Sequence, residues 1–179
     1  MSRRVAVTGL GVLSHAGMGV EALWDSVLAS QSGMQRISAF DPSGFTCQVA
    51  AEVTDFRANK IVPKHYRKAT KVMARDIELA MGAADAAIRD AQLMTPAIDA
   101  DQAPSYAGNR IGAHIGAGLI AAELDELTSA LVEAVDEQGQ FDLRKWGASG
   151  MSHLTPLWLL KYLPNMLACH VTIVHGAQG

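Results

Sequence analysis

The stretch RRVAVTGLGVLS, residues 3–14, decides the fold class because it combines an apolar run with a glycine-rich turn. Residues 4–10 form a short apolar run that is bounded by Gly9 and Gly11. This pattern is typical of a strand that is buried on both faces. Apolar residues at helical spacing follow over residues 20–29. A strand, a turn and a helix in this order predict an α/β domain.

The rest of the chain continues this alternation. Strands are predicted at 48–53 and 110–118, and helices at 69–93, 120–135 and 164–175. Alanines recur at three- and four-residue steps in the helix at 69–93, so another backbone can approach it closely. Residues 138–153 are polar and rich in glycine, which predicts a loop. The alternation predicts a parallel or mixed sheet with helices on both faces.

Composition limits the class of protein. Of the 179 residues 49% are hydrophobic and 18% charged, which is enough apolar material for a buried core. Basic residues number 15 against 18 acidic ones, and we interpret them as dispersed, so a nucleic-acid partner is not predicted. The N-terminal apolar run is broken early, and no run reaches the roughly 18 residues of a membrane span. Cys47 and Cys169 lack CxxC spacing, which indicates a reducing, cytoplasmic compartment.

The glycine turn also suggests a dinucleotide-binding loop, because GLGVLS follows a predicted strand and precedes a helix. Ser14 occupies the place of the third glycine or alanine of that motif, and no carboxylate ends a second strand about twenty residues later. The stretch GAGLIA at Gly116 is no stronger a match. A structural turn is therefore favoured over a cofactor loop.

Histidines and cysteines form no complete catalytic or metal-binding motif in the sequence. His170 and His175 are five residues apart, so they do not share a helical face. The sequence contains neither HExxH nor GxSxG. Cys169 lies in an apolar helix, where a buried thiol is more common than a nucleophile. The residues themselves therefore predict no metal site, no bound cofactor and no complete catalytic set.

The order of several motifs resembles the β-ketoacyl-acyl carrier protein synthases and the related polyketide ketosynthases. The motifs are VAVTGLGVLS; a helix with Trp24, followed by SG and the pair Phe40–Asp41; AAEVTDF at 50–56; an alanine-rich helix that ends in DAQL, with Gln92 in place of the family's glycine; NRIGAHIGAGL at 109–119; and LPNMLACHVTIVHGAQG at 163–179. The resemblance covers nearly the whole chain.

This resemblance implies a thiolase-like fold of which residues 1–179 form the amino-terminal αβαβα half, incomplete, in a dimer. It implies an acyltransferase that condenses an acyl thioester with malonyl-carrier protein, with loss of CO₂, in fatty-acid or polyketide synthesis. The cysteine nucleophile would fall roughly nine residues beyond Gly179 and the catalytic histidines farther on. The chain alone is therefore expected to be inactive. The implied partner is acyl carrier protein, whose phosphopantetheine carries the substrates, and no other cofactor is implied.

Two residues match positions that line the family's acyl pocket, namely Leu119 and Trp158. The alternative that both are ordinary core residues stays open. Residues 136–155 make a connection longer than is usual in the family, which we interpret as an insertion, and His15 stands where many members have proline. Trp158 and the insertion also fit an alternative function, a non-catalytic subunit like a chain-length factor, which shapes the cavity of a partner ketosynthase.

Overall fold

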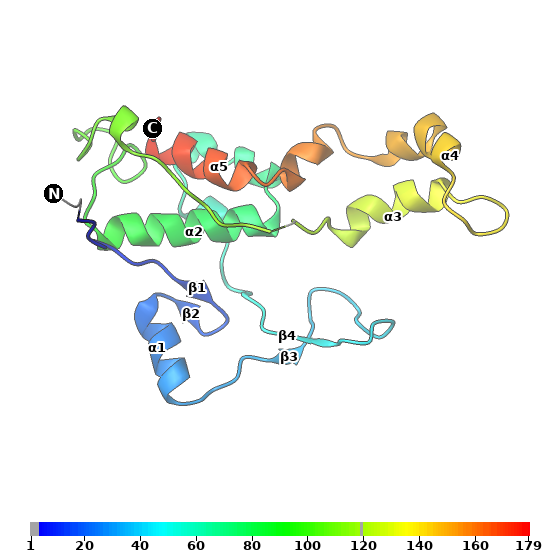
Figure 1. The fold of residues 1–179 in the computed structure, drawn as a ribbon, viewed down its shortest axis with the longest axis horizontal. Coiled ribbons are helices and arrows are strands. Elements are labelled where there is room, and N and C mark those ends of the chain that lie inside the picture. Colours follow the sequence, from blue (N-terminus) through cyan, green and yellow to red (C-terminus); the bar gives the residue numbers. More distant parts are fainter. Residues whose placement is uncertain (1–3, 119) are drawn as a thin grey trace.

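A pair of helices forms the centre of the fold. The computed structural model describes residues 4–118 and 120–179. Helices α2 (Arg75–Asp90) and α5 (Met166–His175) lie side by side in it (Figure 1). Ile77 and Met81, one turn apart on α2, are completely buried, and α5 buries Leu167, Val171 and Val174 at helical spacing. Burial of this apolar stripe is the main stabilising contribution to the fold.

Three short 3-10 turns lead into α2 and complete the core. They are η1 (Ala58–Lys60), η2 (Lys64–Tyr66) and η3 (Ala69–Val72). The predicted helix at 69–93 is thus divided, because Met73 is extended between η3 and α2 and buries its side chain. The Arg75 guanidinium donates to the Phe56 carbonyl oxygen (2.9 Å) and pairs with Glu78. These bonds fix the start of α2 against the preceding segment.

The opening glycine stretch packs directly on α2. A Cβ on Gly11 would overlap the Ala83 carbonyl oxygen, and a Cβ on Gly9 would overlap that of Ala87. The Leu10 N–H donates a hydrogen bond to Asp90 at the end of the same helix (2.8 Å). The predicted close approach of a backbone to the alanine face is confirmed. Only glycine, which lacks a Cβ, fits at this distance.

The predicted strands are largely absent from the described residues. The sheets found there are two antiparallel pairs, β1 (Leu13–Ser14) with β2 (Gly17–Met18) and β3 (Gln35–Arg36) with β4 (Val49–Ala50). The strand predicted at 48–53 is confirmed in part by β4. The strands predicted at 4–10 and 110–118, and with them the parallel sheet, are wrong for this structure.

The reason is the lack of a neighbouring strand for either segment. A strand requires partners for its N–H and C=O groups, and an apolar sequence does not supply them. Val5 is 96% exposed and Val7 is 79% exposed, so the first segment has no covering layer among the described residues. The second begins in a turn, η4 (Gly108–Arg110), and its carbonyls at Gly108 and Ile111 accept from Gln178 and Gly179 instead (2.8 and 2.9 Å).

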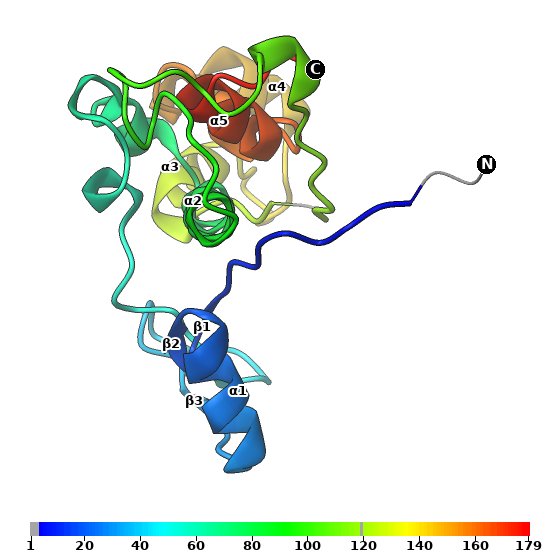
Figure 2. The same ribbon diagram turned by 90° about the vertical axis from the view of Figure 1, so that its left-hand side faces the viewer.

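Helix α1 (Val20–Leu28) confirms the helix predicted at 20–29. It packs against β2 and lies apart from the pair α2 and α5 (Figure 2). The amphipathic pattern predicts that its apolar side chains are buried, yet Trp24, Val27 and Leu28 are exposed. This face of α1 is therefore left uncovered by the described residues.

A helical arm, residues 124–153, extends beyond the central helices (Figure 1). It consists of α3 (Leu124–Glu133), α4 (Leu143–Ala148) and η5 (Gly150–His153). Ala130 of α3 and the C-cap residue Ala134 are completely buried, and Gly150 approaches the Ala130 carbonyl. The Asp142 side chain caps α4 by accepting from the Arg144 N–H (2.7 Å). Much of the loop predicted at 138–153 is therefore helical, because small residues and a cap favour a tight helical hairpin.

Candidate functional site

The two residues expected in an acyl pocket have different outcomes in the structure. Trp158 begins η6 (Trp158–Tyr162), is half-buried, and packs its ring against Tyr162 with centroids 5.1 Å apart. Leu119 lies outside the described residues. The buried Trp158 indole N–H meets no strict hydrogen-bond geometry with the described residues, but it lies close enough to the Glu126 carboxylate to help lower the pKa of that group.

Glu126 of α3 joins the arm to η6. Its two carboxylate oxygens accept hydrogen bonds from consecutive residues, one from Lys161 and one from the Tyr162 hydroxyl (2.7 Å). The Glu123 N–H also hydrogen-bonds to the Tyr162 hydroxyl oxygen (3.2 Å). We call Glu126, Lys161 and Tyr162 the Glu126 latch. The latch has no signature in the sequence, since Glu126 and Lys161 are 35 residues apart and the three residues form no motif.

The latch is charged at neutral pH. Burial acts to raise the pKa of Glu126, but the hydrogen bonds from Lys161 and Tyr162 outweigh it, so this pKa lies below its usual value. Burial acts to lower the pKa of Lys161, but the hydrogen bond to Glu126 outweighs it, so this pKa lies above its usual value. Burial raises the pKa of Tyr162, which keeps its hydroxyl proton. These shifts describe a stable ion pair with a bound phenol and not a general acid.

The two histidines of α5 point to separate partners, as their five-residue spacing predicts. His170 Nδ1 hydrogen-bonds to the Tyr66 hydroxyl (2.7 Å), and His175 Nδ1 to the Thr95 hydroxyl (3.0 Å). Within the described part of the chain the Nε2 atoms of both rings are buried and unpaired. Burial lowers the pKa of each, so both are neutral at pH 7. The geometry gives them a role in joining α5 to η2 and to the turn at Thr95.

Two glycine-rich stretches meet at the end of α5. The helix stops at Gly176, which has a left-handed φ of 70° and directs the chain back along residues 108–111. The bonds from Gln178 and Gly179 to Gly108 and Ile111 hold the two stretches together. The segment expected to lead toward a nucleophile therefore adjoins the stretch GNRIG. Cys169, earlier on α5, is partly exposed and free.

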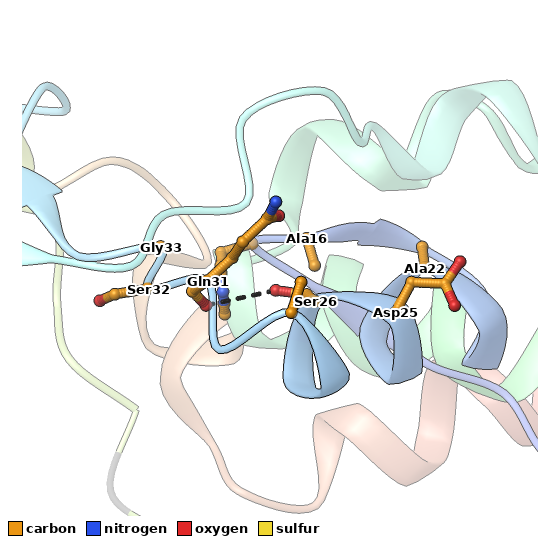
Figure 3. A pocket seen from close by; sticks show the side chains of 9 residues that line it. Ala16, Ala22, Asp25, Ser26, Gln31, Ser32 and Gly33 are labelled. Carbon is orange, nitrogen blue, oxygen red and sulfur yellow. Dashed lines mark hydrogen bonds between the residues drawn. The ribbon is translucent and has the colours of Figure 1, made fainter.

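A polar hollow lies beside α1 (Figure 3). It has a volume of about 450 Å³, and its polar lining comes from His15, Asp25, Ser26, Gln31 and Ser32. The Ser26 hydroxyl donates to the Gln31 carbonyl oxygen (3.3 Å). The His15 ring makes no hydrogen bond to the described residues, so this hollow assembles no nucleophile with a base.

The basic residues are not dispersed, in contrast to the sequence-based expectation. Seven of the 15 lie between residues 57 and 75, where no acidic residue occurs. Six of these are exposed and form no ion pair with the described residues: Arg57, Lys60, Lys64, Arg67, Lys68 and Lys71. We call this group the basic face. Counting charges in a window, and not over the whole chain, is the signal that finds it.

Neither metal sites nor membrane spans are present in the residues that the structure describes. Over 4–118 and 120–179, no three His, Cys, Asp or Glu side chains are placed to hold one ion. The helices of the same residues are too short or too polar to cross a bilayer.

Comparison with known proteins identifies relatives for nearly all of the chain. The model of the β-ketoacyl synthase N-terminal domain family matches residues 2–179. The 3-oxoacyl-[acyl-carrier-protein] synthase 2 of Vibrio cholerae serotype O1 is 30% identical over 178 residues, 99% of this chain and 37% of the relative. The synthase of the same name from Coxiella burnetii is 38% identical over 117 residues, 65% of this chain and 26% of the relative. The chain thus spans little more than a third of the relatives' length.

Solved structures show the same similarity in the fold. A β-ketoacyl synthase from Burkholderia phymatum superimposes with a TM-score of 0.69 at 20% identity, covering 99% of this chain and 38% of that one. The ishigamide ketosynthase/chain length factor gives a TM-score of 0.63 at 24% identity. The match covers 98% of this chain and 38% of that one. A ketosynthase solved with its type II polyketide acyl-carrier protein gives a TM-score of 0.64 at 16% identity. The match covers 99% of this chain and 41% of that one. The fold is therefore similar to that of ketosynthases, which is thiolase-like.

Proposed function

Because the chain belongs to the β-ketoacyl synthase family as its N-terminal domain, we propose that it is part of a 3-oxoacyl-acyl carrier protein synthase. The observation that carries this proposal is the family match, which runs from residue 2 to residue 179. The reaction joins an acyl thioester to malonyl-carrier protein with loss of CO₂, in fatty-acid or polyketide synthesis. The αβαβα arrangement of the complete half belongs to the same proposal.

In this reaction the nucleophile is a cysteine thiolate that receives the acyl group, and the carbanion left by decarboxylation attacks the thioester. That cysteine and its histidine partners are proposed to lie outside residues 1–179. The domain supplies scaffold and pocket wall, so residues 1–179 alone are expected to be inactive. Phosphopantetheine on acyl carrier protein delivers both substrates, and no other cofactor is proposed.

We propose Leu119 and Trp158 as walls of the acyl pocket. The structure supports this for Trp158, whose large half-buried ring belongs to η6 and is backed by Tyr162. A bulky apolar ring is suited to end a pocket for a hydrocarbon chain, because it excludes further methylene groups without offering a charge.

The basic face is proposed as the docking site for the carrier protein. Six exposed cations without acidic neighbours create a positive field, which attracts an acidic partner and speeds association. A carrier protein that docks here must present acidic side chains. The cations follow one another along the segment that contains η1, η2 and η3 and leads into the start of α2.

A dimer in the cytoplasm is proposed for the complete protein. Cys47 and Cys169 are both free in the structure, which supports a reducing compartment. The exposed apolar side chains of α1 and of the arm, Trp24, Leu28, Val132 and Leu143 among them, support burial against further protein.

The proposed function is tested with the complete synthase, malonyl-carrier protein and acyl-carrier proteins as substrates. Condensation is followed as release of CO₂ and as formation of 3-oxoacyl-carrier protein. Residues 1–179 alone are the matched control and should take up no acyl group. A complete protein that forms no 3-oxoacyl product, or acyl transfer by residues 1–179 alone, contradicts the proposal.

The second candidate function is a non-catalytic subunit like a chain-length factor, which the large ring at Trp158 favours. The two functions differ in one residue, because such a subunit has no cysteine at the nucleophile position. Mass spectrometry of the complete protein after incubation with acyl-carrier protein distinguishes them. An acyl-cysteine adduct excludes the second candidate.

A further inference from the structure

The 3-10 turn η6 depends on contacts for its conformation. It has five residues, of which Tyr162 alone is buried, and such turns have poor hydrogen-bond geometry. Its N-cap residue, Leu157, has a left-handed φ of 64°, which is unfavourable for a side chain with a Cβ. Because η6 has little intrinsic stability, neighbouring side chains must determine where it lies.

The strongest side-chain contact on η6 is the Glu126 latch. A carboxylate that accepts from both Lys161 and Tyr162 fixes two consecutive residues at once. Lys161 and Glu126 are both more than two-thirds buried, with 13% and 25% of their side chains exposed, so solvent screens this pair less than a surface pair. The latch thus adds a directed, partly buried contact to the packing of η6 against η3 and α5.

The latch also determines the position of Trp158. The Trp158 ring packs on the Tyr162 ring, and the Tyr162 hydroxyl is held by Glu126. The indole N–H meets no strict hydrogen-bond geometry with the described residues, but it lies close enough to the Glu126 carboxylate to help lower the pKa of that group. Glu126 therefore acts on the orientation of the ring both directly and through Tyr162.

We propose that Glu126 is a positioning residue that sets the acyl-chain length accepted by the synthase. It holds Tyr162 and Lys161, and so it fixes the Trp158 indole as the end wall of the acyl pocket. This inference rests on the proposed function and on Trp158 as a pocket wall. Loss of the latch frees the indole to move aside, and the pocket then admits longer hydrocarbon chains.

The test uses Glu126→Gln in the complete synthase, which keeps the shape of the side chain and removes its charge. Condensation rates are measured with saturated acyl-carrier proteins of increasing chain length. One methylene in an apolar pocket changes discrimination by about tenfold, so the ratio of long-chain to short-chain kcat/KM should rise about tenfold. Lys161→Met removes the same ion pair from the other side and carries the test if Glu126→Gln does not fold.

Glu133→Gln is the matched control, because Glu133 is an exposed carboxylate on the same helix, and it should leave the ratio unchanged. Glu126→Gln and Lys161→Met combined should shift the ratio no further than either alone, as expected for one shared interaction. A purely structural role would lower all rates equally, and an unchanged ratio overturns the inference while the proposed function stands. An inactive wild-type synthase overturns the proposed function and this inference with it.

Discussion

Gly11 lies so close to Ala83 of α2 that a Cβ on the glycine would overlap the alanine's carbonyl oxygen. The contact joins the opening motif of the chain to its longest helix. It also explains why GLGVLS is a packing motif, since the face of the loop toward α2 is filled by the helix.

Gly11→Ala should destabilise the complete protein by roughly 1–3 kcal/mol, because the added methyl group forces apart two backbones that cannot move independently. The measurement is the free energy of unfolding in urea. Gly44→Ala is the control, since a Cβ at Gly44 has no atom within 4 Å. Equal stability of the two variants would show that Gly11 does not pack on α2.

Gln92→Gly should stabilise the protein by up to about 1 kcal/mol. Gln92 follows the last residues of α2 with a left-handed φ of 54°, a conformation that costs a side chain with a Cβ about 1–2 kcal/mol. Part of this gain is lost to the greater freedom of glycine in the unfolded chain. Ala29→Gly, at the C-cap of α1 with φ −79°, should instead destabilise. The thermal midpoints of both variants test the prediction.

Stability should fall as the pH drops below about 6.5, the usual pKa of histidine. Burial lowers the pKa of His170 and His175 in the folded state, so below pH 6.5 the unfolded chain binds more protons than the folded one. The stabilisation that the two histidines contribute is complete above their pKa in the unfolded chain. It is lost as the pH falls toward their lower pKa in the folded protein.

His170→Gln should reduce this pH dependence. The measurement is the free energy of unfolding between about pH 7.5 and about pH 5, a range that spans the usual pKa of histidine. The exposed His153, changed to Gln, is the control and should leave the slope as in the wild type. A slope that His170→Gln does not change would assign the pH dependence to other groups.

Reversing charge on the basic face should weaken carrier binding. The double variant Lys64→Glu and Lys68→Glu should raise KM for acyl-carrier protein roughly tenfold, about 1.4 kcal/mol, with little change in kcat. The effect should shrink at high salt, because exposed charges are screened. Arg144→Glu on the arm is the control, and an equal rise in its KM would contradict docking at the basic face.

The sequence predicted the helices well and the strands poorly, for a physical reason. A helix satisfies its backbone within one segment, so the spacing at Val20–Leu28 or Met166–His175 was sufficient. A strand requires a partner from elsewhere, and residues 4–10 and 110–118 have none here. The apolar pattern predicted strands there, but an apolar pattern does not supply the neighbouring strands that would pair with them.

The candidate site was predictable only where a motif existed. Trp158 was predicted as a pocket residue from its match to a family position and stays a prediction. Glu126 and Lys161 were missed because their contact depends on how the arm folds back. The left-handed φ of Gln92 accounts for the glycine that the family resemblance leads one to expect at that position.

The hydrogen bond from the Glu123 N–H to the Tyr162 hydroxyl joins the residue just before the arm to the end of η6, a short distance along the chain after the arm. A segment whose ends meet can be shortened, lengthened or replaced with little entropic cost to the remaining chain, because its closure is already achieved at the base. The arm is therefore the part of this domain best suited to exchange between related synthases, and a graft that keeps Glu123, Glu126 and Tyr162 should transplant one protein's arm onto another's core.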